Sequence, residues 1–99
     1  MANRWGIPRT VEEMVLLRDL NCVYCRIVFG ETGKTRRTWE HITNDIRLNG
    51  PDNIALCCRS CNSSKGSKTL SDWLNSNYCK NKDISAESVA EVVRNRLEG

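Results

Sequence analysis

Two cysteine pairs of identical spacing constrain the fold of this chain more than any other feature. The first pair is Cys22-x-x-Cys25 and the second is Cys58-x-x-Cys61. Zinc prefers a tetrahedral shell of thiolate or imidazole ligands, and each C-x-x-C turn supplies two sulfurs from one short segment. We therefore expect these four cysteines to hold one structural zinc ion. Disulfide bonds and redox chemistry are the alternatives.

The other two cysteines are expected to lie outside the metal site. Cys57 allows a second register, Cys57-x-x-x-Cys61, but strand alternation favours Cys58 as the ligand and Cys57 as a core residue. Cys79 has no evident partner and is expected to be a free thiol. Between the pairs lie the 32 residues 26–57, more than the roughly 15–20 of a simple zinc ribbon. This segment must therefore contain secondary structure of its own.

The length of 99 residues predicts one small domain that a metal staple would help to stabilise. No apolar run approaches the ~20 residues needed to span a membrane. The first residues also lack the apolar core of a signal peptide. We expect a cytoplasmic protein, and reduced thiols in that compartment favour metal binding over disulfides.

A helix is predicted to open with a capping box at Thr10 and Glu13 and to end near Asn21. Its apolar residues have helical spacing and are expected to face the core. They are Val11, Met14, Val15, Leu17 and Leu20.

Residues 35–42 and 54–57 are rich in β-branched and apolar side chains, which predicts two strands joined by a long polar loop at 43–53. Residues 30–35 end like a phosphate-binding loop but lack its first glycine, so a polar turn is expected there. Short helices are predicted at 62–68 and around 70–74, with Gly66 limiting the first.

Ser85 is predicted to cap a last helix, with Ile84 and Val89 forming a hydrophobic staple. The apolar stripe of this helix either packs on the core or forms a dimer contact, and the sequence leaves both open. The stripe consists of Val89, Val92, Val93 and Leu97.

Positive charge is concentrated in the middle of the chain. Residues 26–68 hold eight Lys or Arg and four acids, whereas the remainder holds seven Lys or Arg and eight acids. A basic surround is what phosphate binding requires, although a solvated basic face is the simpler alternative.

His41 is the only histidine and follows Glu40 directly. Hydrolysis of a phosphodiester needs a proton acceptor for water and a cation at the phosphate. A neutral imidazole suits the first task, and the oxygens of Glu40 and Asn62 suit Mg²⁺ or Mn²⁺. Strand neighbours point to opposite faces, so a twist or bulge is expected to bring Glu40 and His41 into one site.

These residues, with the cysteine pairs, resemble the HNH (ββα-metal) endonuclease family in its zinc-knuckle branch. The resemblance covers about residues 22–68. It implies that Glu40 is the first metal ligand, His41 the general base, Asn53 a brace of the loop, and Asn62 the distal ligand. Lys65 matches a basic residue common at that point in the branch. The family often has Asp where this chain has Glu40, and Asp45 ranks lower as an acidic alternative.

We therefore predict an α+β fold with one domain over residues 1–99: a zinc-stapled ββα-metal core at 22–68 and helical flanks at 1–21 and 69–99. The predicted function is a DNA endonuclease with structural Zn²⁺ and catalytic Mg²⁺ or Mn²⁺ that nicks as a monomer. Arg36, Arg37 and Lys65 are the expected DNA phosphate contacts. The alternative is a zinc-stapled nucleic-acid-binding module without catalysis, and the last helix is a candidate homodimer contact.

Overall fold

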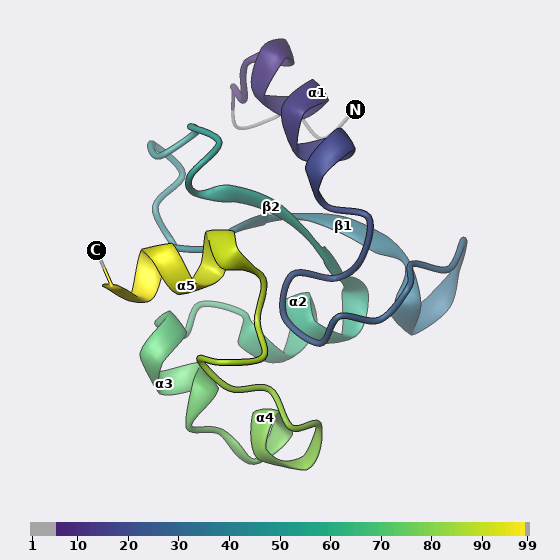
Figure 1. Cartoon of the computed structure of the whole chain (residues 1–99), viewed down its shortest axis with the longest axis vertical. Coiled ribbons are helices and arrows are strands. Elements are labelled where there is room, and N and C mark those ends of the chain that lie inside the picture. The colour runs from purple at the N-terminus through teal and green to yellow at the C-terminus, as the bar shows by residue number, and fades with distance from the viewer. Residues whose placement is uncertain (1–5, 99) are drawn as a thin grey trace.

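A two-stranded antiparallel ribbon lies at the centre of the protein, and helices cover both of its faces (Figure 1). The computed structural model describes residues 6–98. Strand β1 (Arg37–His41) pairs with β2 (Ile54–Cys58), and the register runs without a break from Arg37↔Cys58 to His41↔Ile54. The two predicted strands are therefore confirmed, and the long loop between them leaves and re-enters the ribbon at one end.

One face of the ribbon packs against helix α1 (Arg9–Arg18). Val11 and Val15, one helical turn apart, lie in a cluster with Ile54 and Leu56 of β2. Alternate residues of a strand point to the same face, and Ile54 and Leu56 accordingly both contribute to this small core.

The other face of the ribbon is covered by helix α2 (Arg59–Lys65), which follows β2 without a loop. Cys58 is the N-cap of α2, and its sulfur accepts a hydrogen bond from the backbone N–H of Cys61. Gly66 ends the helix with a φ of +50°, a conformation that side chains with a Cβ rarely adopt. The predicted helix at 62–68 thus exists but begins and ends three residues earlier.

The larger core lies on the α2 side and is completed by the C-terminal part of the chain. Helix α3 (Leu70–Leu74) contributes Trp73, whose ring meets that of Tyr24 edge-to-face at a centroid distance of 4.8 Å. Helix α4 (Asn77–Asn81), which the sequence did not predict, contributes the buried Cys79. Through these two residues, α3 and α4 share one core with the segment of the first cysteine pair.

The last helix, α5 (Glu91–Glu98), begins five residues later than a Ser85 cap predicts. Ser85 does not cap it, because residues 85–90 form a turn and the N–H of Ala90 bonds to Val23 O at 2.8 Å instead. Val89 and Val93 are buried in the larger core. Of the two possibilities left open for this stripe, the structure shows packing on the core.

The predicted capping box at the start of α1 is wrong. The helix begins at Arg9, with Pro8 as its N-cap and no side chain bonded to the free N–H groups. The carbonyl of Pro8 accepts from the N–H groups of Val11 and Glu12, so Thr10 already lies inside the first turn. The hydroxyl of Thr10 therefore cannot occupy the capping position. The helix also ends at Arg18, earlier than predicted.

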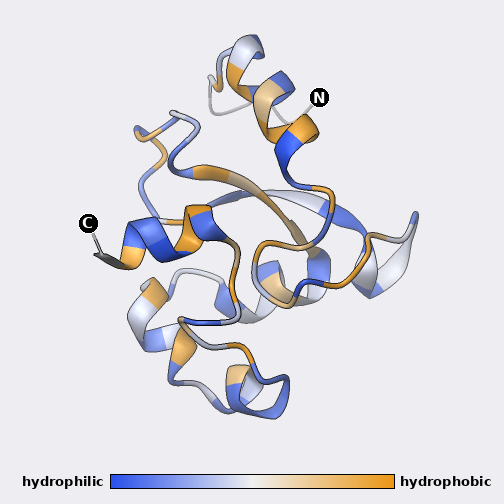
Figure 2. Cartoon of the chain, viewed as in Figure 1, coloured by the Kyte–Doolittle hydropathy of each residue, from blue (hydrophilic) through white to orange (hydrophobic). Residues whose placement is uncertain are grey.

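Only part of the apolar stripe of α1 is buried. Val15 is fully buried, whereas Met14 is 55% and Leu17 82% exposed, and Leu20 beyond the helix is 71% exposed. A ribbon of two strands is narrow and covers only a narrow strip of the surface of α1. Val11 and Val15 lie in that strip, and the apolar residues beside it remain exposed to solvent. Figure 2 shows apolar and polar segments alternating along α1.

No helix within residues 6–98 has the length and apolar character required to cross a bilayer.

Replacement of Val15 by Ala should lower the free energy of unfolding by about 2 kcal/mol, because two methyl groups are lost from a fully buried site. Replacement of Leu17 by Ala, in the same helix, should change it by less than about 0.5 kcal/mol. Chemical denaturation of the two variants measures the difference. Equal losses would show that α1 packs through a different face.

Candidate functional site

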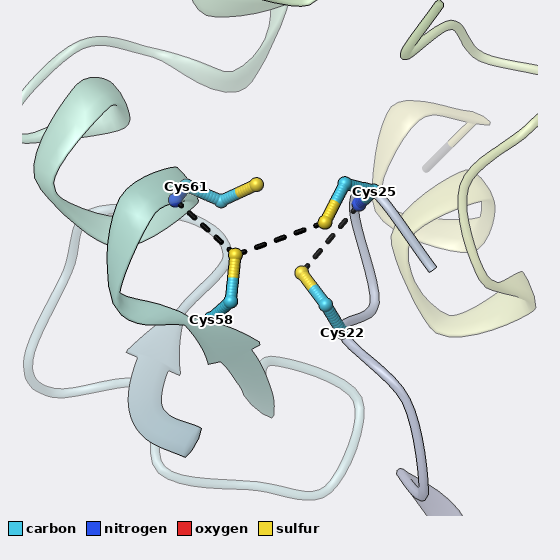
Figure 3. Close-up of side chains that lie close together, drawn as sticks. All are labelled: Cys22, Cys25, Cys58 and Cys61. Atoms are coloured by element: carbon cyan, nitrogen blue, oxygen red, sulfur yellow. Dashed lines mark hydrogen bonds between the residues drawn. The ribbon is translucent and has the colours of Figure 1, made fainter. Parts of the chain in front are cut away.

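Four cysteine side chains converge on one point between the first knuckle and the β2–α2 junction (Figure 3). The sulfur atoms of Cys22, Cys25, Cys58 and Cys61 all lie within 4.8 Å of one another, and the Cys25 and Cys58 sulfurs are 3.7 Å apart. In a tetrahedral site with Zn–S bonds of about 2.3 Å, the sulfurs are about 3.8 Å apart. The cluster fits zinc, as the sequence predicted.

Hydrogen bonds within the cluster favour the deprotonated form of two of its sulfurs, those of Cys22 and Cys58, and raise the pKa of Cys25 and Cys61. The N–H groups of Cys25 and Cys61 point at the sulfurs of Cys22 and Cys58, each at 3.5 Å. The pKa of the Cys22 thiol is lowered to about 7, first by its hydrogen bond with Cys25. The pKa of Cys58 is lowered as well, because its three neighbouring thiols stabilise its thiolate. A metal ion needs its thiol ligands in this deprotonated form.

The two remaining cysteines are placed as predicted. Cys57 is fully buried on the neighbouring strand position, and its carbonyl accepts a hydrogen bond from Thr38 Oγ1 at 2.7 Å. Cys79 is a buried free thiol in α4. Within residues 6–98, the cluster Cys22–Cys25–Cys58–Cys61 is the only group of three or more Cys, His or acidic side chains close enough to share a metal.

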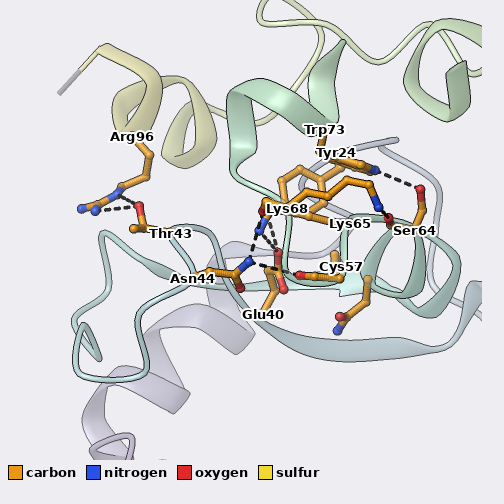
Figure 4. A network of polar contacts seen from close by, with 12 residues as sticks. Tyr24, Glu40, Thr43, Asn44, Cys57, Ser64, Lys65, Lys68, Trp73 and Arg96 are labelled. Carbon is orange, nitrogen blue, oxygen red and sulfur yellow. Dashed lines mark hydrogen bonds and ion pairs between the residues drawn. The ribbon is translucent and has the colours of Figure 1, made fainter. Parts of the chain in front are cut away.

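Glu40 is buried beneath α2 and held by two partners (Figure 4). Its Oε2 atom accepts a hydrogen bond from the Tyr24 hydroxyl at 2.7 Å and lies 3.1 Å from Lys65 Nζ. Burial raises the pKa of Glu40, while the charge of Lys65 and the bond from Tyr24 oppose that rise. The carboxylate is thus kept next to a cation in the interior.

Lys65 does not occupy the position expected of a DNA contact. Its side chain is 1% exposed, with the ammonium group turned inward to Glu40. A phosphate outside the protein has no access to it in this conformation. The burial of Lys65 could not be predicted from the sequence, because no local pattern distinguishes a buried lysine from an exposed one at this position of the helix.

His41, at the end of β1, faces the loop that follows. Its Nε2 atom lies 2.8 Å from Oδ1 of Asn49, and the residue is 8% exposed. The expected bulge in β1 is absent: the pairing is regular through His41, so Glu40 and His41 point to opposite sides of the strand as neighbours do. The imidazole is still near enough to influence the pKa of Glu40 electrostatically. Asn49 gave no sequence signal, since the loop is rich in similar residues.

Asn53 closes the loop between the strands. Its Oδ1 accepts from the N–H of Thr43 at 2.7 Å, and its Nδ2 donates to the carbonyls of Thr43 and Leu48 at 3.1 Å each. The side chain is fully buried. These contacts bridge the two ends of the loop that carries Asn49, which is the position of the expected brace.

A second support for the loop comes from the distant C-terminal helix. Arg96 of α5 donates to Thr43 Oγ1 at 2.9 Å and pairs with Asp52 at 3.2 Å. The acidic alternative Asp45 is occupied nearby: Arg47 binds both of its oxygens and lowers its pKa to about 2. Arg96 is a loop contact that sequence reasoning missed, since it lies 53 residues from Thr43.

Asn62, directly after Cys61 in α2, faces β1. Its Nδ2 atom donates to Thr38 Oγ1 at 3.0 Å and to the carbonyl of Trp39 at 3.1 Å. Thr38 and Glu40 share the α2 side of the strand, so the structure brings Asn62 to the same face as Glu40.

Arg36 and Arg37 are exposed at the start of β1. Together with Phe29, Gly30 and Glu31 they line a surface hollow. Unlike Lys65, both guanidinium groups are accessible to a ligand in solvent.

A ribbon followed by a short helix, with four clustered cysteines that fit a zinc ion, defines a small ββα protein. The family model described as HNH endonuclease matches residues 22–68, just under half of the chain. Comparisons with curated proteins and with solved structures find no match. Residues 22–68 thus carry an HNH domain of the zinc-knuckle type, as the sequence predicted, and such a domain indicates a nuclease-type or nucleic-acid-binding function.

Replacement of Cys61 by Ser should abolish zinc binding and unfold the domain, because a structural zinc contributes folding free energy directly. Replacement of Cys79 by Ala should leave one zinc ion per chain, since its sulfur lies outside the cluster. Elemental analysis and circular dichroism of the two variants check this. A wild-type protein that is folded without zinc would contradict the assignment.

Proposed function

We propose that the protein is a metal-dependent DNA endonuclease in which Glu40 and Asn62 hold a cation on the α2 side of β1. His41, at the end of the same strand, acts as the general base, and Asn53 holds the loop. The observation that supports this most is the orientation of the two oxygen donors. The contacts of Glu40 use Oε2, and the hydrogen bonds of Asn62 use Nδ2. Each side chain is therefore held by one end, and the other end offers an oxygen, Oε1 or Oδ1, on the same side of β1.

Carboxylate and amide oxygens are hard donors, and they suit Mg²⁺ or Mn²⁺ better than zinc. The residues present thus fit a second, exchangeable cation distinct from the thiolate site. When bound, such an ion would neutralise charge on the scissile phosphate and on the leaving oxygen. Glu40 and Asn62 would hold it.

His41 is proposed as the general base that takes a proton from the attacking water. Its contact with Asn49 fixes the ring on a loop that Asn53 and Arg96 hold in place. A base positioned in this way typically contributes ~10²–10⁴-fold to the rate. By family resemblance, the products would carry a 5′ phosphate and a 3′ hydroxyl. One site per chain cuts one strand, so a monomer should nick.

The ion pair between Glu40 and Lys65 supports a second candidate function, a nucleic-acid-binding module without catalysis. In that case the carboxylate would serve only to neutralise a buried lysine. Cleavage of supercoiled plasmid with Mg²⁺, Mn²⁺ or EDTA separates the two functions, because the binding module would not cut under any of these conditions.

Replacement of His41 by Ala should reduce plasmid nicking by at least ~10²-fold, the usual effect of losing a general base. Zinc content and DNA affinity should remain near their wild-type values. Excess Mn²⁺ should not restore the rate, because no cation replaces the proton acceptor. Nicking at the wild-type rate would refute the mechanism and favour the binding module.

Replacement of Asn62 by Ala should also abolish nicking, but through weaker binding of the catalytic cation. A Mn²⁺ titration of the nicking rate should therefore restore part of the activity in this variant and none in the His41 variant. The same response to Mn²⁺ in both variants would contradict the separate roles.

Replacement of Arg36 by Gln should weaken DNA binding to all sequences alike and flatten its salt dependence by about 0.9 in log–log slope. Replacement of Lys80 by Gln makes the same charge change on α4, away from the ribbon, and should leave the slope unchanged. Fluorescence anisotropy in EDTA across a salt series measures both. A change of sequence preference without a change of slope would contradict a phosphate contact.

A further inference from the structure

A lysine and a tyrosine, both fully buried, meet at a single oxygen atom of Glu40. Tyr24 Oη and Lys65 Nζ lie 2.7 Å and 3.1 Å from Oε2 (Figure 4). Tyr24 is 0% and Lys65 1% exposed. An apolar side chain could occupy either of these buried positions. The convergence of a hydroxyl and an ammonium group on one carboxylate oxygen therefore needs an explanation.

Stability alone is a poor reason for the lysine. Removing an ammonium group from water carries a penalty of several kcal/mol, and a buried ion pair recovers it only with good additional hydrogen bonds. Lys65 Nζ has the Glu40 contact as an ion pair but makes no hydrogen bond with the rest of the described chain. A well-packed apolar pair would be at least as stable there.

We propose that Lys65 and Tyr24 are positioning residues: they fix Glu40 through Oε2 and thereby present Oε1 to the catalytic divalent cation. This inference rests on the proposed function, because it assigns a role toward the cation of that site. Lys65 thus acts on the metal ligand from inside the protein and does not contact the DNA.

The two positioning residues also connect the zinc site to Glu40. Tyr24 lies between the ligands Cys22 and Cys25, and Lys65 lies one helical turn after Cys61 in α2. The zinc ion would therefore determine where both polar groups stand. Partners that orient a metal ligand typically change metal affinity by ~10–100-fold when removed.

The test measures Mn²⁺ binding to the zinc-loaded full chain without DNA. The electron paramagnetic resonance signal of the free ion reports how much Mn²⁺ remains unbound. Glu40→Gln identifies binding at the proposed site, because it should abolish it. Tyr24→Phe removes only the hydroxyl and keeps the ring packed on Trp73. It should weaken Mn²⁺ binding about tenfold at unchanged zinc content and melting temperature.

Lys65→Met should weaken Mn²⁺ binding at least as much, whereas Lys68→Met, which removes an exposed charge from the end of the same segment, should not. DNA affinity in EDTA adds a second readout: Lys65→Met should keep the wild-type salt slope, while loss of a phosphate contact would flatten it by about 0.9. If Lys65→Met does not fold, Tyr24→Phe decides.

Wild-type Mn²⁺ affinity in Tyr24→Phe, with binding lost in Glu40→Gln, would overturn the positioning role and leave the proposed function intact. A wild-type protein that binds no Mn²⁺ through Glu40 would overturn both.

Discussion

The four-thiolate cluster is the constraint on which the rest of the structure depends. It joins the knuckle at residues 22–25 to the junction of β2 and α2, and everything between them must close into a compact loop. A domain of this size buries a limited apolar area, so a metal staple adds to the stability that its core provides. The larger core gathers around the cluster, with Trp73 and Val93 packed beside the cysteines. Loss of zinc would therefore remove the centre of that core.

Buried polar side chains hold the candidate site in place. Asn53 satisfies three backbone groups of the loop, and Glu40 is held from two sides by groups that are themselves buried. Burying such groups is unfavourable unless they are paired. Glu40 is paired here with Tyr24 of the first knuckle and Lys65 of α2, which orients β1 relative to both, while Asn53 holds together the two ends of its own loop.

Several features could be predicted because they depend on spacing along the chain. The two C-x-x-C pairs specify a four-sulfur site, and a continuous apolar run predicts the strand at 54–57, which in the structure extends to Cys58. The residues Glu40, His41, Asn53 and Asn62 were identified by their order in the HNH pattern. Helix boundaries were less accurate: α5 begins late because the N–H of Ala90 bonds to Val23, a contact between segments that no local pattern encodes.

By itself, the sequence predicted the four-cysteine cluster and the two strands from short-range spacing and composition, and it indicated the candidate site residues through their resemblance to the HNH pattern. The tertiary structure decided what each side chain faces. It left Leu17 in solvent because the ribbon is narrow, and it directed Arg96 to the loop. It also turned Lys65 inward to Glu40. Burial and charge pairing depend on segments distant in sequence, and only the folded chain brings them together.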